Sequence, residues 1–232
     1  MKKFFILLLA LVLFAPSALA DTDKEIVFHG IPWEISVNEL VDQLKERKIP
    51  ISSSDILANQ NMRLWGSQFT SIGESYINSA GYAIMFWDYD DRIKIAGYPV
   101  RNIDIFSHYG IIDGKISFDA NDSEYYLCTI MFAANDEMAI SIYHDLMSKL
   151  NTLYKTGTES ASKYGSTAYT YTVWNGANNT AVCLYRSTST SSDYQFVYLM
   201  YGKTNSEQTL REVRRLVIEH EIQSVADDTT GL

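Results

Sequence analysis

Hydrophobic residues recur at helical spacing shortly after residue 35. Ser36 and Glu39 stand at the start of this stretch with the spacing of a capping box, in which a hydroxyl and a carboxylate accept opposite backbone N–H groups. The pattern predicts an amphipathic helix that begins after Ser36 and ends before Pro50. Its apolar face consists of Val37, Leu40, Val41 and Leu44.

Two later segments show the same helical spacing. One begins at Asn135 or Asp136 and is expected to end at Gly157, because glycine readily terminates a helix. The other begins with a second capping-box pair, Thr204 and Glu207. The apolar positions are Ile142, Leu146, Leu150, Leu153 and Tyr154 in the first segment, and Leu210, Val213 and Val217 in the second.

Eight other runs have the composition and alternation of β-strands. In residues 168–174, Tyr169, Tyr171 and Val173 would share one face of the strand, and the threonines between them would share the other. Asp113-Gly114 is a dipeptide typical of tight hairpin turns. The predicted strands are residues 62–70, 82–87, 100–106, 115–118, 125–133, 168–174, 180–186 and 194–201.

The order of these elements indicates the fold class. Strands occur in clusters between the helices rather than one per helix, which predicts an α+β fold with antiparallel sheet and about three helices packed on one side. The helical and strand patterns suit a single domain over residues 21–222. A division into two similar halves, 24–118 and 119–222, is open, and residues 223–232 are expected to form a flexible tail.

The first 20 residues have the pattern of a secretory signal peptide. Lys2 and Lys3 precede an apolar run over residues 4–14, and Ala18-Leu19-Ala20 supplies a cleavage site with small residues. We therefore expect cleavage near Ala20 and a secreted, extracytoplasmic protein. No later apolar run approaches the length of a membrane-spanning helix, so membrane insertion is not expected.

The charge of the chain narrows the choice of partners. It carries 28 acidic and 19 basic residues, a formal net charge of −9. Nucleic-acid binding requires Lys and Arg to neutralise phosphates, so a nucleic-acid partner is not expected. A protein or a glycan remains as the expected ligand class.

Tyrosines crowd the second half of the chain. If the strands alternate as predicted, some of these rings face away from the core and could form an aromatic surface that binds a protein or glycan. The alternative is ordinary pairing between neighbouring strands, with hydroxyls at the water edge. The candidate binding residues are Tyr169, Tyr171, Trp174, Tyr185 and Tyr198.

A cluster of carboxylates is the only candidate for catalysis. Asp88, Asp90 and Asp91 follow Trp87 in the sequence, and a sugar-cleaving site combines paired carboxylates with aromatic rings. A hairpin turn rich in Asp has the same composition. The chain is therefore expected to be a non-enzymatic binding protein, with a hydrolase that acts on glycan or cell-surface material as the alternative.

The sequence contains few residues that could bind a metal or cofactor or form a disulfide. Residues 119–124 place oxygen ligands at alternate positions but lack the glycine and final glutamate of an EF-hand loop. No Walker loop, G-x-G-x-x-G or H-E-x-x-H motif occurs, so no metal or cofactor is expected. Cys128 and Cys183 lie in predicted strands and could form a disulfide or remain two buried thiols.

The segment that precedes the first helix contains the sequence G-I-P-W at residues 30–33. Trp33 is placed to fold onto the apolar face of that helix and to cover the core. The segment resembles the start of exported bacterial proteins of unknown function, in which G-I-P-W often continues with Gly rather than Glu34. The order of helices and strands resembles the β-lactamase-inhibitor-protein-like architecture of two tandem α+β halves, which implies a concave sheet presented to protein partners.

Overall fold

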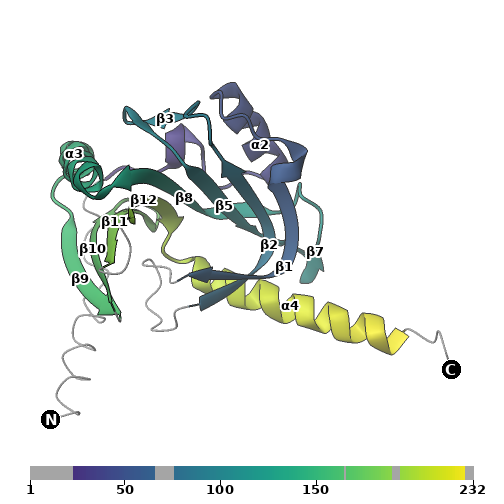
Figure 1. The fold of residues 1–232 in the computed structure, drawn as a ribbon. Coiled ribbons are helices and arrows are strands. Elements are labelled where there is room, and N and C mark those ends of the chain that lie inside the picture. The colour runs from purple at the N-terminus through teal and green to yellow at the C-terminus, as the bar shows by residue number, and fades with distance from the viewer. Residues whose placement is uncertain (1–22, 66–75, 165, 190–193, 228–232) are drawn as a thin grey trace, which may run out of the picture.

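The computed structural model of the protein describes residues 23–65, 76–164, 166–189 and 194–227, and it is dominated by one antiparallel sheet of eight strands (Figure 1). The sheet bends into an arch with an outer and an inner face. Its strands, in their order across the sheet, are β1 (Ile56–Trp65), β2 (Tyr76–Trp87), β5 (Asn102–His108), β8 (Glu124–Asn135), β12 (Tyr194–Lys203), β11 (Thr180–Ser189), β10 (Thr167–Asn175) and β9 (Thr158–Tyr164).

The α+β prediction is confirmed. Within the described residues, three α-helices accompany the sheet: α2 (Val37–Glu46), α3 (Asp136–Tyr154) and α4 (Ser206–Asp227). Two short hairpins complete the fold, β3 (Lys94–Ile95) with β4 (Tyr98–Pro99), and β6 (Gly110–Ile112) with β7 (Lys115–Ser117). In the part of the chain that the structure describes, none of the helices combines the length and apolarity needed to cross a membrane.

The N-terminal segment packs into the core as predicted. Trp33 is 1% exposed and stacks on Tyr125 of β8, with ring centroids 4.7 Å apart. Its Nε1 donates a hydrogen bond to the Ile26 carbonyl (2.8 Å), and the Tyr125 hydroxyl donates to the Ile31 carbonyl (2.7 Å). These two bonds satisfy the carbonyls of Ile26 and Ile31, which lie outside the isolated bridge between Glu25 and Ala177. Trp33 therefore joins this segment to the centre of the sheet.

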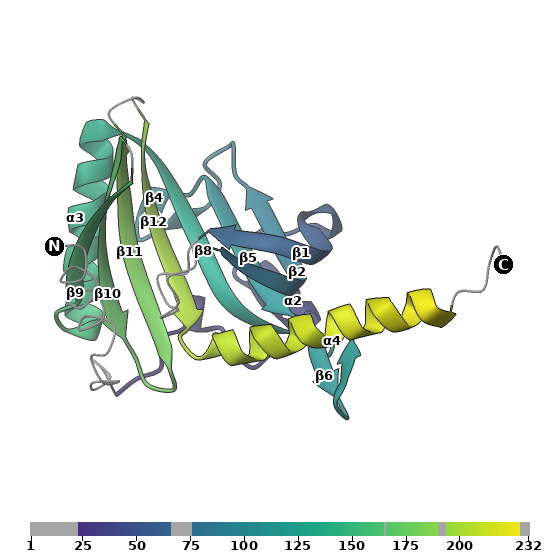
Figure 2. The same cartoon turned by 90° about the horizontal axis from the view of Figure 1, so that it is seen from below.

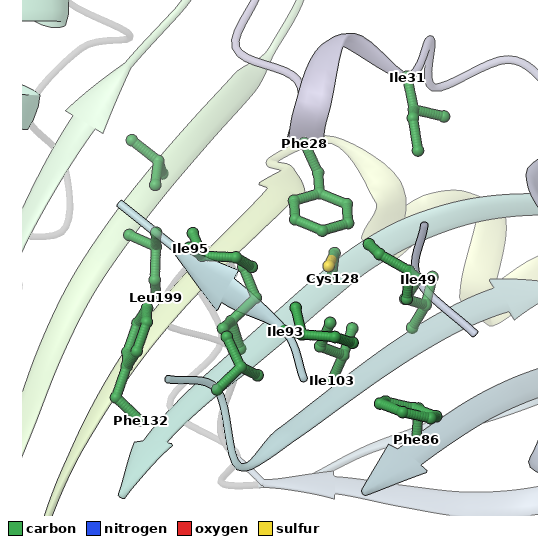
Figure 3. Close-up of a cluster of buried hydrophobic side chains, with 14 of the residues drawn as sticks. Phe28, Ile31, Ile49, Phe86, Ile93, Ile95, Ile103, Cys128, Phe132 and Leu199 are labelled. Atoms are coloured by element: carbon green, nitrogen blue, oxygen red, sulfur yellow. The ribbon is translucent and has the colours of Figure 1, made fainter. Parts of the chain in front are cut away.

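The helix that follows begins where the sequence indicated. The Ser36 hydroxyl accepts from the Glu39 backbone N–H, and the Glu39 carboxylate accepts from the Ser36 N–H, so the capping box is complete. The four predicted apolar positions of α2 are all buried against the outer face of the sheet. Figure 3 shows part of this core, where Phe28 points toward Cys128 of β8 beside Ile93 and Ile103.

Helix α3 covers the outer face of β8, β10, β11 and β12. Its C-terminus differs from the prediction: the helix ends at Tyr154, and Lys155 rather than Gly157 takes the left-handed conformation (φ 66°). Gly157 has a different role, because a Cβ atom at that position would lie 2.6 Å from the Trp174 ring. Leu153, predicted to be apolar core, is 65% exposed.

Helix α4 differs from the prediction in the side of the sheet on which it packs and in its first and last residues. Leu210 packs with Ala83, Phe106 and Leu127 on the inner face, so α4 lies on the opposite side of the sheet from α2 and α3. The helix begins at Ser206, and the Thr204 hydroxyl donates to the Asn179 carbonyl (3.1 Å) instead of capping it. Residues 223–227, assigned to a flexible tail, continue the helix to Asp227.

The two proposed halves share one sheet and one core. Residues 24–118 contribute β1, β2 and β5, and residues 119–222 contribute β8 to β12. β5 and β8 pair directly, which joins the two sets of strands. The largest hydrophobic cluster contains residues from both halves, as a single domain requires. The element order within the halves also differs, because α2 precedes its strands whereas α3 follows β8.

Candidate functional site

The inner face of the sheet carries a continuous row of large side chains. Strand pairing brings one residue from each of six adjacent strands into register, and paired residues point to the same face. We call this set the aromatic row. It consists of Trp87, Asn102, Met131, Tyr198, Tyr185 and Tyr171.

A second row runs beside the first, one side-chain repeat closer to α4. We call it the acidic row, because it contains the carboxylate of Asp104. It consists of Met85, Asp104, Thr129, Met200, Cys183 and Val173. The next row includes Ala83, Phe106 and Leu127 and is covered by Leu210 of α4. Figure 2, seen from below the arch, shows α4 crossing this end of the strands, with α3 on the far side of the sheet.

Four of the five aromatic residues predicted to bind a ligand lie together on this face. Tyr169 stacks on Tyr185 with centroids 5.7 Å apart and planes 14° apart, and Tyr185 lies 5.0 Å from Tyr198. Tyr171 is paired directly with Tyr185. All four side chains are partly exposed, as is Phe196 beside Tyr198. Burial raises the pKa of Tyr185 and Tyr198, so both phenols are neutral and able to donate hydrogen bonds.

Trp174 must be removed from the predicted binding set. It belongs to the opposite face of β10 and is fully buried beneath α3. Its Nε1 donates to Asn151 Oδ1 (3.0 Å) and to the Lys155 carbonyl (3.1 Å). Alternation along the strand separates position 174 from 169 and 171, which the sequence already implied. Trp174 therefore fixes the end of α3 to the sheet.

Asp104 is a site residue that the sequence analysis missed. It lies between Met85 and Thr129 on the inner face, and Asn102 Nδ2 donates to its Oδ1 (2.9 Å). Burial raises the pKa of Asp104 to about 6, and the hydrogen bond from Asn102 opposes this rise only in part. The sequence offered one signal: a lone Asp in the strand-like run 100–106, where charged residues are rare.

The carboxylates proposed for catalysis do not converge. Asp88 is fully buried and accepts hydrogen bonds from the Ile93 N–H (2.6 Å), the Asp90 N–H (3.3 Å) and Arg92 Nε (3.3 Å). Burial opposes ionisation of Asp88, but these donors outweigh it and lower its pKa. Asp90 and Asp91 are exposed, and Asp91 has a positive φ of 52°. This geometry is that of a carboxylate that organises a turn.

An exposed aromatic pair extends the aromatic row at its β2 end. Trp87 is 44% exposed and Tyr89 is 72% exposed, and their rings stack at 6.1 Å with planes 11° apart. Trp87 belongs to the row through its pairing with Asn102. The large side chains of the inner face therefore continue to the edge of the arch.

The remaining candidates have structural roles. Cys128 and Cys183 are both buried and free, and they lie on opposite faces of strands that β12 separates, so no disulfide joins them. Asp119 accepts from the Asn121 N–H (2.8 Å) within its own turn. Among the described residues, no group of His, Cys, Asp and Glu side chains could hold a metal ion.

The region predicted to be a signal peptide, residues 1–20, lies outside the described residues. Comparisons with protein-family models, with curated proteins and with solved structures found no match.

Proposed function

We propose that this chain is an exported, non-enzymatic binding protein that recognises a protein or glycan ligand with the inner face of its sheet. The observation that supports this most strongly is the aromatic row, in which Trp, Tyr, Met and Asn side chains occupy six adjacent strands in register. Partly exposed Tyr and Trp supply large contact area together with polar groups, and both are enriched in interface cores.

The dimensions of the face suit an extended ligand. Five strand-to-strand steps from β2 to β10 span about 24 Å, at about 4.8 Å for each step. Two side-chain repeats along the strands add a width of about 13 Å, which gives a footprint of about 300 Å². Within this footprint, Asn102, Met131 and Cys183 are buried, and the partly exposed contact groups include the tyrosines and Trp87.

Export agrees with the sequence features of residues 1–20 and with the acidic composition. Outside the cell, the excess of acidic over basic residues also favours solubility for a protein that exposes so many aromatic side chains.

The hydrolase alternative receives less support. A glycosidase places two carboxyl groups about 5–10 Å apart on either side of the scissile bond. Among the residues of the aromatic row and the acidic row, one is acidic, and that residue is Asp104. Asp88 is held by its own loop and presents no oxygen to solvent.

The proposal is tested with immobilised full-length chain and extracts of cell-surface proteins and cell-wall glycans. We compare the native chain with the double variant Tyr185→Ala/Tyr198→Ala and with the single variant Tyr171→Ser. The control is Leu153→Ser, which changes an exposed apolar residue on α3, away from the inner face.

We expect the native chain and the control to retain the same ligands, and the inner-face variants to lose at least nine-tenths of the bound material. Thermal unfolding of each variant checks that the fold persists. Equal retention by the folded Tyr171→Ser and double variants would overturn the proposed role of this face.

A further inference from the structure

We infer that the partner is a protein that places a cationic side chain, Lys or Arg, against Asp104 in the middle of the inner face. This inference rests on the proposed binding role and assigns the chemical class of the partner. It starts from Asp104 itself, a carboxylate whose cross-strand neighbours, Met85 and Thr129, carry no charge.

Among the described residues, no basic side chain forms a salt bridge or hydrogen bond with Asp104. Its neighbours across the sheet are Met85 and Thr129, and its one hydrogen bond within the described residues comes from Asn102. A carboxylate has acceptor sites for about four donors, so this one bond leaves most of them available. An ionised group in apolar surroundings is costly unless it is paired. A cationic group on a ligand would supply the positive charge and the additional hydrogen-bond donors that the described part of the chain does not provide to Asp104.

The tyrosine rings that share the inner face with Asp104 favour a positively charged ligand. Tyr198 lies on the adjacent row and is close enough for the Asp104 charge to raise the pKa of its phenol, together with the larger effect of burial. Tyr185 and Tyr169 continue from Tyr198 as a stack. Aromatic faces attract ammonium and guanidinium groups, most strongly where water is excluded. A carboxylate on the same face of the sheet as these rings is therefore complementary to Lys or Arg.

Three methionines indicate a protein rather than a glycan. Met85 and Met200 belong to the acidic row, and Met131 belongs to the aromatic row next to Tyr198. Flexible thioether side chains adapt to apolar protein surfaces, and methionine is enriched in protein interfaces. The aromatic row also extends far beyond the size of a small organic cation. A protein segment with one basic residue between apolar residues fits both features.

The inference implies a dependence on pH. Among the described residues, the titratable groups whose pKa the Asp104 charge affects are Cys128 and Tyr198, and burial keeps both neutral because it raises their pKa values. Met85 and Thr129 do not titrate, and His108 lies four residues away on the same strand. Because Asp104 has a pKa of about 6, it is mostly ionised at pH 7.5 and mostly protonated at pH 5. A bound cation should therefore be released on acidification.

The test uses the full chain with ¹³C-labelled methionine methyl groups, since Met85, Met131 and Met200 report directly on the surroundings of Asp104. The first probe is the capped pentapeptide Tyr-Leu-Arg-Leu-Tyr, and the second replaces its arginine with citrulline, a neutral isostere. The third probe is a neutral hexasaccharide, maltohexaose. The variants are Asp104→Asn and, as a matched control, Asp90→Asn, which removes an exposed carboxylate outside the inner face.

We expect the arginine peptide to bind at pH 7.5 at least tenfold more tightly than the citrulline peptide. Asp104→Asn should reduce that ratio to within twofold, whereas Asp90→Asn should leave it unchanged. Affinity for the arginine peptide should fall about tenfold between pH 7.5 and pH 5, while the citrulline peptide shows no such change.

Equal binding of the two peptides, or an undiminished ratio in Asp104→Asn, would overturn the inference and leave the binding role intact. Methyl shifts caused by maltohexaose alone would also overturn it, because the ligand class would then be a glycan. If no probe shifts the methyl groups, the cation-binding position is rejected, and the extract assay with the Tyr185 and Tyr198 variants decides the binding role separately.

Discussion

Replacing Trp33 with Ala should strongly destabilise the fold. The indole is 1% exposed, stacks on Tyr125 and donates to the Ile26 carbonyl. A buried Trp removes about 200 Å² from water, which corresponds to about 5 kcal/mol at about 25 cal/mol per Å². Alanine retains part of that burial but leaves a cavity, and such substitutions cost about 3–5 kcal/mol. The unpaired Ile26 carbonyl adds about 1–3 kcal/mol unless water reaches it.

The combined loss is therefore expected to be about 4 kcal/mol or more, a large part of the stability of a domain. Urea unfolding followed by tryptophan fluorescence and far-UV circular dichroism measures it. With an m-value of about 3 kcal/mol/M, the midpoint should fall by about 1.3 M. Trp33→Phe retains a ring but loses the hydrogen bond, so it should cost about 1–3 kcal/mol.

Trp87→Ala is the matched control, since it removes the same side chain from a position that is 44% exposed. It should cost less than half as much as Trp33→Ala. A Trp33→Ala midpoint equal to that of the native chain, or a larger loss for Trp87→Ala, would refute the argument that Trp33 secures the N-terminal segment to the sheet.

Three further outcomes test other parts of the structure. Burial raises the pKa of Asp104 to about 6, above its value of about 3.9 in the unfolded chain. Between pH 4 and pH 6, the native state therefore holds a proton on Asp104 that the unfolded chain has lost, and the native state loses stability as pH rises through this range. Asp104→Asn should therefore be more stable than the native chain at pH 7.5 by up to about 3 kcal/mol and lose this advantage near pH 4. A constant difference between the urea midpoints of the two proteins from pH 4 to pH 7.5 would contradict the raised pKa of Asp104. Asp88→Ala should lower the free energy of unfolding by about 2–4 kcal/mol, because it leaves the Ile93 N–H without its acceptor. Asp90→Ala should lower it by less than about 0.5 kcal/mol, and comparable losses would show that Asp88 does not organise the loop. Cys128 and Cys183 should both react with a thiol reagent in denaturant without reductant but not in the native state; two unreactive cysteines in denaturant would indicate a disulfide.

Local patterns predicted the elements whose signals are complete within a few residues. The Ser36 capping box and the apolar face behind it are self-contained, so the start of α2 was predicted correctly. The second box was misleading, because the helix begins two residues later, at Ser206, and the Thr204 hydroxyl donates to the Asn179 carbonyl. The side of the sheet on which α4 packs depends on the inner-face residues that Leu210 meets, and these come from distant strands.

The candidate site was predictable in composition but not in arrangement. Alternation along one strand places Tyr169 and Tyr171 together, and it also excludes Trp174 from their face. The contribution of Asn102, Met131 and Trp87 depends on strand order, which joins residues far apart in the chain. The position of Asp104 on the inner face follows from the same register, and its one signal in the sequence is that a charged residue is rare in a strand-like run.

Strand β9 went unpredicted because its residues give no hydrophobic alternation. Thr158, Ser160 and Ser162 share one face, and Glu159 and Lys163 share the other. The same composition has a benefit for solubility, since β9 forms the edge of the sheet and exposes backbone groups that another chain could pair with. Charged and small polar side chains along that edge offer an incoming strand no apolar surface, so a protein with so many Tyr-rich strands ends its sheet there without promoting aggregation.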